Sequence, residues 1–70
     1  MNALVADGKS YINAEDVNFA VTDVLLEAME NKAPGLGQML TDVHAHHNED
    51  ALHVTMADGT SFKLVVEQIG

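Results

Sequence analysis

The 70-residue chain contains no cysteine, no tryptophan and no arginine, and it has a single proline. Without cysteine it can hold neither a disulfide-stapled scaffold nor a thiolate metal site. No apolar run reaches the roughly 18 residues of a membrane-spanning helix, and the first residues lack the basic start and apolar stretch of a signal peptide. We therefore expect one small domain over residues 1–70 that works in the cytoplasm.

Positive charge is also scarce. Three lysines stand against eleven aspartates and glutamates, which gives a formal net charge of -8. Such a surface is repelled by nucleic acids and anionic lipid and is attracted to basic protein surfaces. At 47% apolar residues the chain is hydrophobic enough to fold despite this charge. We expect a basic protein surface as the partner, with no direct binding to nucleic acid or membrane.

The sequence predicts one long helix at about residues 14–31. Asn13 is a good N-cap, and Asp16 three residues later can complete a capping-box-like start. Lys32 and Pro34 mark the end of the helix. Apolar residues at three- and four-residue spacing predict a core-facing side made of Val17, Ala20, Val21, Val24, Leu25 and Ala28.

Two further stripes follow the same helix. Phe19 and Leu26 lie roughly opposite the predicted core side, where either the N-terminal segment or a second protein chain would cover them. Between these two sides lies an acidic stripe whose members fall within about 60° of one another. A stripe of this kind is more commonly a solvated face than a binding site. Its members are Asp16, Asp23, Glu27 and Glu30.

The C-terminal part predicts a β-hairpin. Leu52 and Val54 alternate with polar residues, as do Phe62 and Leu64 after the sequence Ala57-Asp58-Gly59. A three-residue loop with Gly59 in the left-handed conformation places all four apolar residues on one face.

Residues 36–47 fit either a short helix or a strand, and the strand is favoured. As a strand, this segment would pair Val43 with Val54 and Ala45 with Leu52, with Thr41 on the same inner face. The predicted fold is then a two-layer α+β sandwich with a short N-terminal strand or hairpin, the long helix and an antiparallel sheet of about three strands. The alternative is a second short helix at 36–47 followed by the C-terminal hairpin.

Histidine supplies the only candidate site chemistry. In the strand model His44 lies across from His53, with His46 on the same outer face, and such a group can bind zinc or another divalent metal. A polar outer sheet face that happens to contain histidine is the favoured interpretation. No nucleophile elbow and no phosphate-binding loop is present, so we expect neither an enzyme nor a cofactor.

The sequence therefore favours a non-enzymatic interaction protein whose acidic stripe binds a basic site, in the strongest form as a nucleic-acid mimic that inhibits its partner. In size and charge it resembles small phage-encoded inhibitors such as anti-CRISPR proteins. One alternative is a metal-binding or pH-sensing module built on the histidines. Another is a small accessory domain that forms a homodimer through Phe19 and Leu26.

Overall fold

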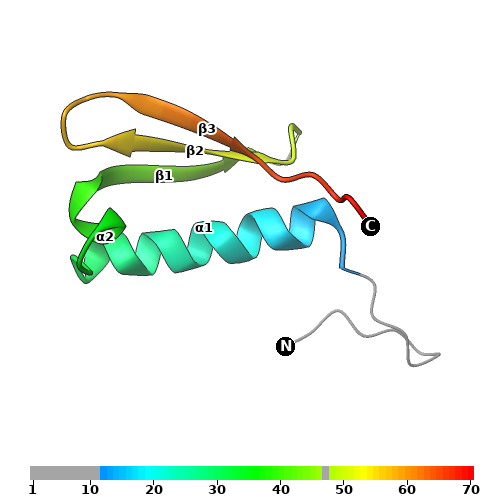
Figure 1. The fold of residues 1–70 in the computed structure, drawn as a ribbon, viewed down its shortest axis with the longest axis horizontal. Coiled ribbons are helices and arrows are strands. Elements are labelled where there is room, and N and C mark those ends of the chain that lie inside the picture. The colour runs from blue at the N-terminus through cyan, green and yellow to red at the C-terminus, as the bar shows by residue number, and fades with distance from the viewer. Residues whose placement is uncertain (1–11, 47) are drawn as a thin grey trace.

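A computed structural model describes residues 12–46 and 48–70 and shows an α+β fold in two layers (Figure 1). The strands form one antiparallel sheet in the order β1-β2-β3, and the long helix runs along one face of it, nearest to β1. This arrangement confirms the predicted fold class, while the predicted N-terminal strand or hairpin lies outside the described residues. In chain order the elements are α1 (Ala14–Glu30), α2 (Leu36–Met39), β1 (Leu40–His46), β2 (Ala51–Met56) and β3 (Ser61–Val65).

Helix α1 begins where its capping residues predict. The Asn13 side chain accepts a hydrogen bond from the backbone N–H of Asp16 at 2.8 Å, and the Asp16 carboxylate accepts one from the backbone N–H of Asn13 at 3.2 Å. This reciprocal pair satisfies two backbone donors that a helix start leaves without partners. Asp16 therefore has a structural role in addition to its charge.

The segment that fitted both a helix and a strand contains both. Four residues form α2, and the chain then continues directly into β1. The register shifts between Leu40 and Asp42, so Thr41 is an extra residue in β1. Because this bulge interrupts the alternation, Leu40 is buried and Thr41 is exposed, and the predicted inward position of Thr41 is wrong.

The rest of the sheet register was predicted correctly. Val43 pairs with Val54 and Ala45 with Leu52, whereas Leu52 also pairs with Leu64 on the other side. Gly59 has the expected left-handed backbone, with φ of 91°, in a three-residue loop between Met56 and Thr60. Glycine suits this position because a side chain there would strain the backbone.

The core of the described chain is small. Its buried apolar side chains all come from β1 and β2, and four half-buried residues pack around them: Leu25, Leu26, Met29 and Met56. Every residue of β3 is exposed, because α1 covers chiefly β1. A core of this size supplies only a few kcal/mol of net stability in a domain of this length. The buried apolar residues are Leu40, Val43, Ala51, Leu52 and Val54.

The prediction of the core-facing side of α1 was wrong for its three valines and for Ala20, which is also exposed. Val17, Val21 and Val24 are exposed, and the buried positions of the helix are Asn18 and Thr22. Asn18 donates from Nδ2 to the carbonyl oxygen of Ala51 at 2.8 Å, which ties the helix to the start of β2. The helix is therefore rotated so that its broadest apolar stripe lies beside the sheet and not under it.

The two helices approach each other closely at a glycine. A Cβ atom on Gly37 would stand 2.5 Å from the carbonyl oxygen of Ala28, so only glycine fits there without a backbone shift. This contact holds α2 against the same flank of α1 that carries the exposed valines, since Ala28 lies on their helical face.

Within the described residues, no helix has the length and apolar character needed to cross a bilayer.

Candidate functional site

Three surface features of the described chain have the chemistry of binding sites. The first is the acidic ridge, which consists of Asp16, Asp23, Glu27 and Glu30. All four side chains are exposed. At 100° per residue they lie about 140° around the helix from the positions that face the sheet. The fold therefore presents the ridge on the outer side of α1.

Among the residues that the structure describes, no cation neutralises the ridge. Helix α1 has no lysine or arginine, and the ion pairs formed within residues 12–46 and 48–70 involve only other parts of the chain. Asp16 is hydrogen-bonded in the capping box. Over the same residues, Asp23, Glu27 and Glu30 have no hydrogen-bond or ion-pair partner, so three carboxylates are available to an external group.

The second feature is the His–Glu cluster, which consists of His46, Glu49 and His53. The imidazole rings of His46 and His53 are stacked, with centroids 3.8 Å apart and planes inclined by 24°. His53 Nε2 lies 3.4 Å from Glu49 Oε1. One ligand atom from each of the three residues lies within 4.8 Å of the other two.

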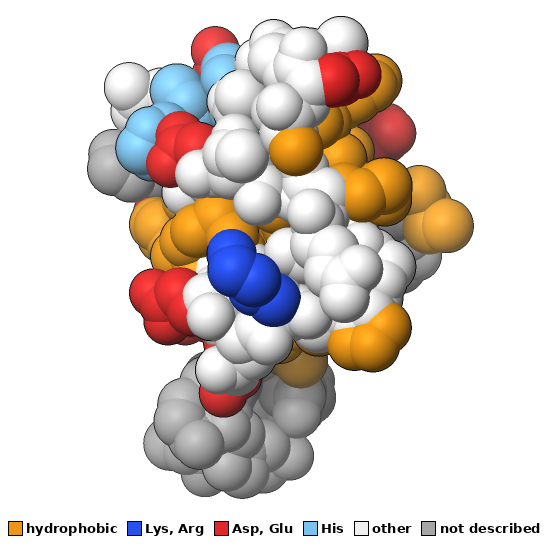
Figure 2. Space-filling view, turned by 90° about the vertical axis from the view of Figure 1, so that its left-hand side faces the viewer, with side chains coloured by type: hydrophobic (Ala, Val, Ile, Leu, Met, Phe, Trp, Pro, Cys, Tyr) orange, Lys and Arg blue, Asp and Glu red, His pale blue; other side chains and the backbone are white. Residues whose placement is uncertain are grey.

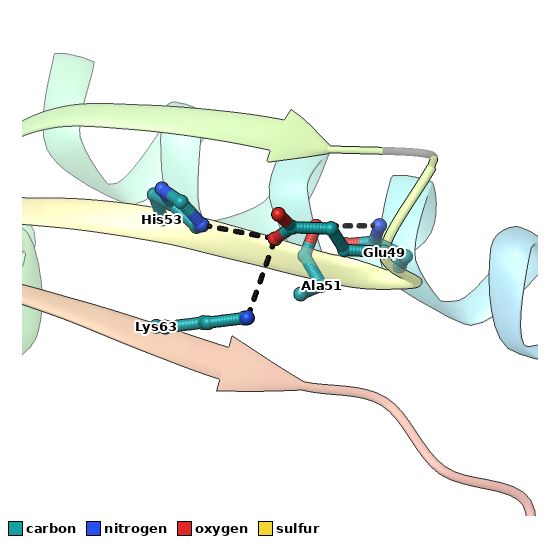
Figure 3. A network of polar contacts seen from close by, with 5 residues as sticks. Glu49, Ala51, His53 and Lys63 are labelled. Atoms are coloured by element: carbon teal, nitrogen blue, oxygen red, sulfur yellow. Dashed lines mark hydrogen bonds and ion pairs between the residues drawn. The ribbon is translucent and has the colours of Figure 1, made fainter.

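Lys63 lies beside Glu49 and on the strand next to His53 (Figure 3). Its Nζ lies 3.5 Å from Glu49 Oε1, and its position follows from the pairing of Lys63 with His53 across β2 and β3. The ammonium group beside Glu49 lowers the pKa of that carboxyl below its ordinary value, and the contact with His53 lowers this pKa further. Glu49 is thus a carboxylate at neutral pH.

The structure brings together two of the three histidines proposed as a group. His44 does lie across from His53 in the register, but its Nε2 turns to Asp42 Oδ2 at 3.0 Å. Its ring is nearly perpendicular to that of His46, with centroids 6.4 Å apart. Glu49 takes its place in the cluster. One signal in the sequence points to Glu49: it lies in the predicted turn between the two strands that carry His46 and His53.

The third feature is the apolar side, six exposed hydrophobic residues on α1, α2 and β3. Phe62 and Leu64 lie on the same sheet face as Leu52 and Val54, in the part along β3 that α1 does not cover. Met39 and Phe62 both line an open hollow of about 470 Å³ near the β2–β3 turn. Hydrophobic side chains gather on the right-hand side of Figure 2, whereas the histidines lie at its upper left. The members of the apolar side are Val17, Val21, Val24, Met39, Phe62 and Leu64.

Phe19 and Leu26, the predicted oligomer or partner contact, lie on the other flank of α1. Leu26 is half-buried and packs against the core of its own chain. Phe19 is exposed over 40% of its surface and takes part in a further interaction. The uncovered apolar surface is therefore larger on the valine flank than at this pair.

Comparisons with protein-family models, with curated proteins and with solved structures found no match to this chain.

Proposed function

We propose that the protein is a non-enzymatic interaction protein whose acidic ridge binds a basic surface of a partner protein. The observation that carries this proposal is the set of exposed, unneutralised carboxylates of Asp23, Glu27 and Glu30 on the outer side of α1. A partner cation can pair with these groups without breaking a hydrogen bond or ion pair among the described residues. A basic surface that normally binds phosphate groups can bind these carboxylates instead, because carboxylate and phosphate oxygens accept the same charge-assisted hydrogen bonds.

In its strongest form the ridge mimics a nucleic acid. The axial spacings between its successive carboxylates are roughly 10, 6 and 4.5 Å at 1.5 Å rise per residue, which loosely brackets the spacing of phosphates along a strand. The protein then occupies a groove of the partner that normally binds nucleic acid, and so inhibits the partner. Phage-encoded anti-CRISPR inhibitors of similar size and charge have this general character. Such a role places its action in the cytoplasm.

The active form in this proposal is a homodimer joined through the apolar side. If a fully exposed large apolar side chain presents roughly 150–200 Å², the six members at 36–65% exposure leave about 500 Å² of apolar surface. A standard interface buries about 800 Å² per partner, of which a little more than half is apolar. The area therefore fits a second copy, and the acidic ridge, on a different side of α1, stays outside the interface.

Affinity capture with matched variants tests the proposed function. The ridge variant carries Asp23→Asn, Glu27→Gln and Glu30→Gln, and it keeps Asp16 because that residue caps the helix. The control variant loses the same number of charges elsewhere, by Asp42→Asn, Asp50→Asn and Glu67→Gln. We expect the wild type and the control to recover a nucleic-acid-binding protein from the native host, and the ridge variant to lose it.

Added nucleic acid separates mimicry from other acidic binding. A mimic competes with nucleic acid for one groove, so excess DNA or RNA should displace the partner from the immobilised protein. Recovery of the same partner by the ridge variant would contradict the proposed function. Retention of the partner on the immobilised protein in the presence of excess nucleic acid would contradict only the proposal that the ridge mimics a nucleic acid.

A further inference from the structure

The His–Glu cluster lies on the outer face of the sheet, away from both the acidic ridge and the apolar side. His46 comes from β1, His53 from β2 and Glu49 from the turn between them. His46 and His53 are diagonal neighbours, because His46 pairs with Ala51 and His53 with His44. Both imidazoles are half-buried, so the sheet and the turn restrict their positions.

The donor set is that of a transition-metal site. A neutral imidazole has one unprotonated ring nitrogen, which is the atom that binds a metal ion, and the carboxylate of Glu49 adds an anionic oxygen. Two imidazoles and one carboxylate suit zinc and its neighbours in the first transition row, whereas magnesium and calcium prefer oxygen ligands throughout. Three protein ligands leave further positions to water.

The distances allow one ion to reach all three ligands. An ion equidistant from atoms 4.8 Å apart would lie about 2.8 Å from each of them. Zinc binds histidine nitrogen and carboxylate oxygen at about 2.0–2.2 Å, so each ligand atom must move inward by about 0.7 Å. Because the lone pair of an imidazole nitrogen lies in the plane of its ring, the stacked rings of His46 and His53 must also splay apart for both nitrogens to point at one ion. Rotation about the side-chain bonds of the two histidines and of the exposed Glu49 supplies both changes.

The net negative charge of the protein favours cation binding at the His–Glu cluster, and the nearby ammonium group of Lys63 opposes it. The net charge of -8 attracts cations to the molecule as a whole. The ammonium group of Lys63 opposes them locally, because it is paired with Glu49 at 3.5 Å. The Lys63 side chain is exposed over about half of its surface, so it can leave Glu49 without disturbing the core. Lys63 thus competes with a metal ion for the same carboxylate.

We propose that His46, Glu49 and His53 form a site for one divalent transition-metal ion, with zinc as the first candidate. This assignment departs from the sequence-based expectation of no cofactor, and it replaces His44 by Glu49 in the ligand set. It is independent of the proposed binding role of the acidic ridge.

Titration of the metal-free protein with zinc sulfate tests the site. We expect one zinc ion per chain by calorimetry, and a rise in melting temperature of about 10 °C at 100 times the dissociation constant, because the ion stabilises the native state by mass action. Magnesium at the same concentration should leave the melting temperature unchanged. Absence of zinc binding, or one ion shared by two chains, would overturn the proposal.

Four variants identify the ligands. His53→Ala and Glu49→Gln should each weaken zinc binding at least tenfold. Glu49→Gln keeps the size and shape of an exposed side chain in the turn, so this variant should fold as the wild type does. His44→Ala is the matched control on the same face and should bind as the wild type does. Lys63→Gln should bind zinc severalfold more tightly, a gain that a merely structural role of the cluster does not predict. Equal losses in His44→Ala and His53→Ala, or weaker binding in Lys63→Gln, would contradict this ligand set.

Discussion

Replacing Val24 by aspartate is expected to convert the proposed homodimer into a folded monomer. Val24 is 65% exposed in the single chain, so the substitution removes little intrachain packing. In the dimer the substitution would place one carboxylate from each copy within an apolar interface. Burying an unpaired charge there removes its hydration and so disfavours association. We expect the dimer dissociation constant to rise roughly 100-fold or more, measured by sedimentation velocity over a range of concentrations.

Val65 provides a matched control for this experiment. It is 64% exposed, but it lies on the opposite sheet face from Leu64, outside the apolar side. Val65→Asp makes the same chemical change and should leave the dimer intact. A wild-type protein that sediments as a monomer at high concentration would contradict the homodimer.

The second large effect is expected at Asn18. This side chain is fully buried, and its Nδ2 donates to the Ala51 carbonyl oxygen. Asn18→Asp removes that donor and places a carboxylate against a carbonyl oxygen without water. We expect the free energy of unfolding to fall by about 3 kcal/mol or more, which is most of what a domain of this size possesses. Urea unfolding followed by circular dichroism measures this loss.

Two other substitutions separate the lost hydrogen bond from the buried charge. Asn18→Leu leaves the Ala51 carbonyl without its donor but adds no charge, so it should cost about 1–3 kcal/mol. Asn13→Asp makes the same amide-to-acid change at the exposed N-cap, where both residues cap well, and should be nearly neutral. If Asn18→Asp were as stable as Asn13→Asp, the buried hydrogen bond would not hold the helix to the sheet.

The sheet could be predicted from sequence because its pattern has a period of two. A shift of one residue would turn Leu52 and Val54 outward, and Gly59 selects a loop that keeps them facing Phe62 and Leu64. The position of Thr41 could not be predicted in this way, since a bulge depends on where the strand enters the sheet and not on the alternation itself.

The rotation of α1 was not predictable from its hydrophobic period. The period of 3.6 identifies the broadest apolar stripe, but it does not tell whether the sheet of the same chain or a second chain covers that stripe. The burial of Asn18 has no local signal in the sequence, because its partner, the Ala51 carbonyl, is 33 residues away. Likewise Glu49 joins His46 and His53 only through the shape of the turn between β1 and β2.

The most direct test of the acidic ridge is the rate at which the protein associates with its captured partner at two salt concentrations. Opposite charges accelerate the encounter, and this acceleration weakens as the Debye length falls from about 30 Å at 0.01 M to about 8 Å at 0.15 M salt. The ridge variant should associate about tenfold more slowly than the wild type at low salt, with a flatter salt dependence.

The control variant, which loses the same number of charges outside α1, should keep an association rate close to that of the wild type. This comparison separates the ridge from the net charge of the molecule. If the ridge variant and the control variant associated at the same rate at both salt concentrations, Asp23, Glu27 and Glu30 would be only a solvated face of the helix, and the proposed binding role would be lost.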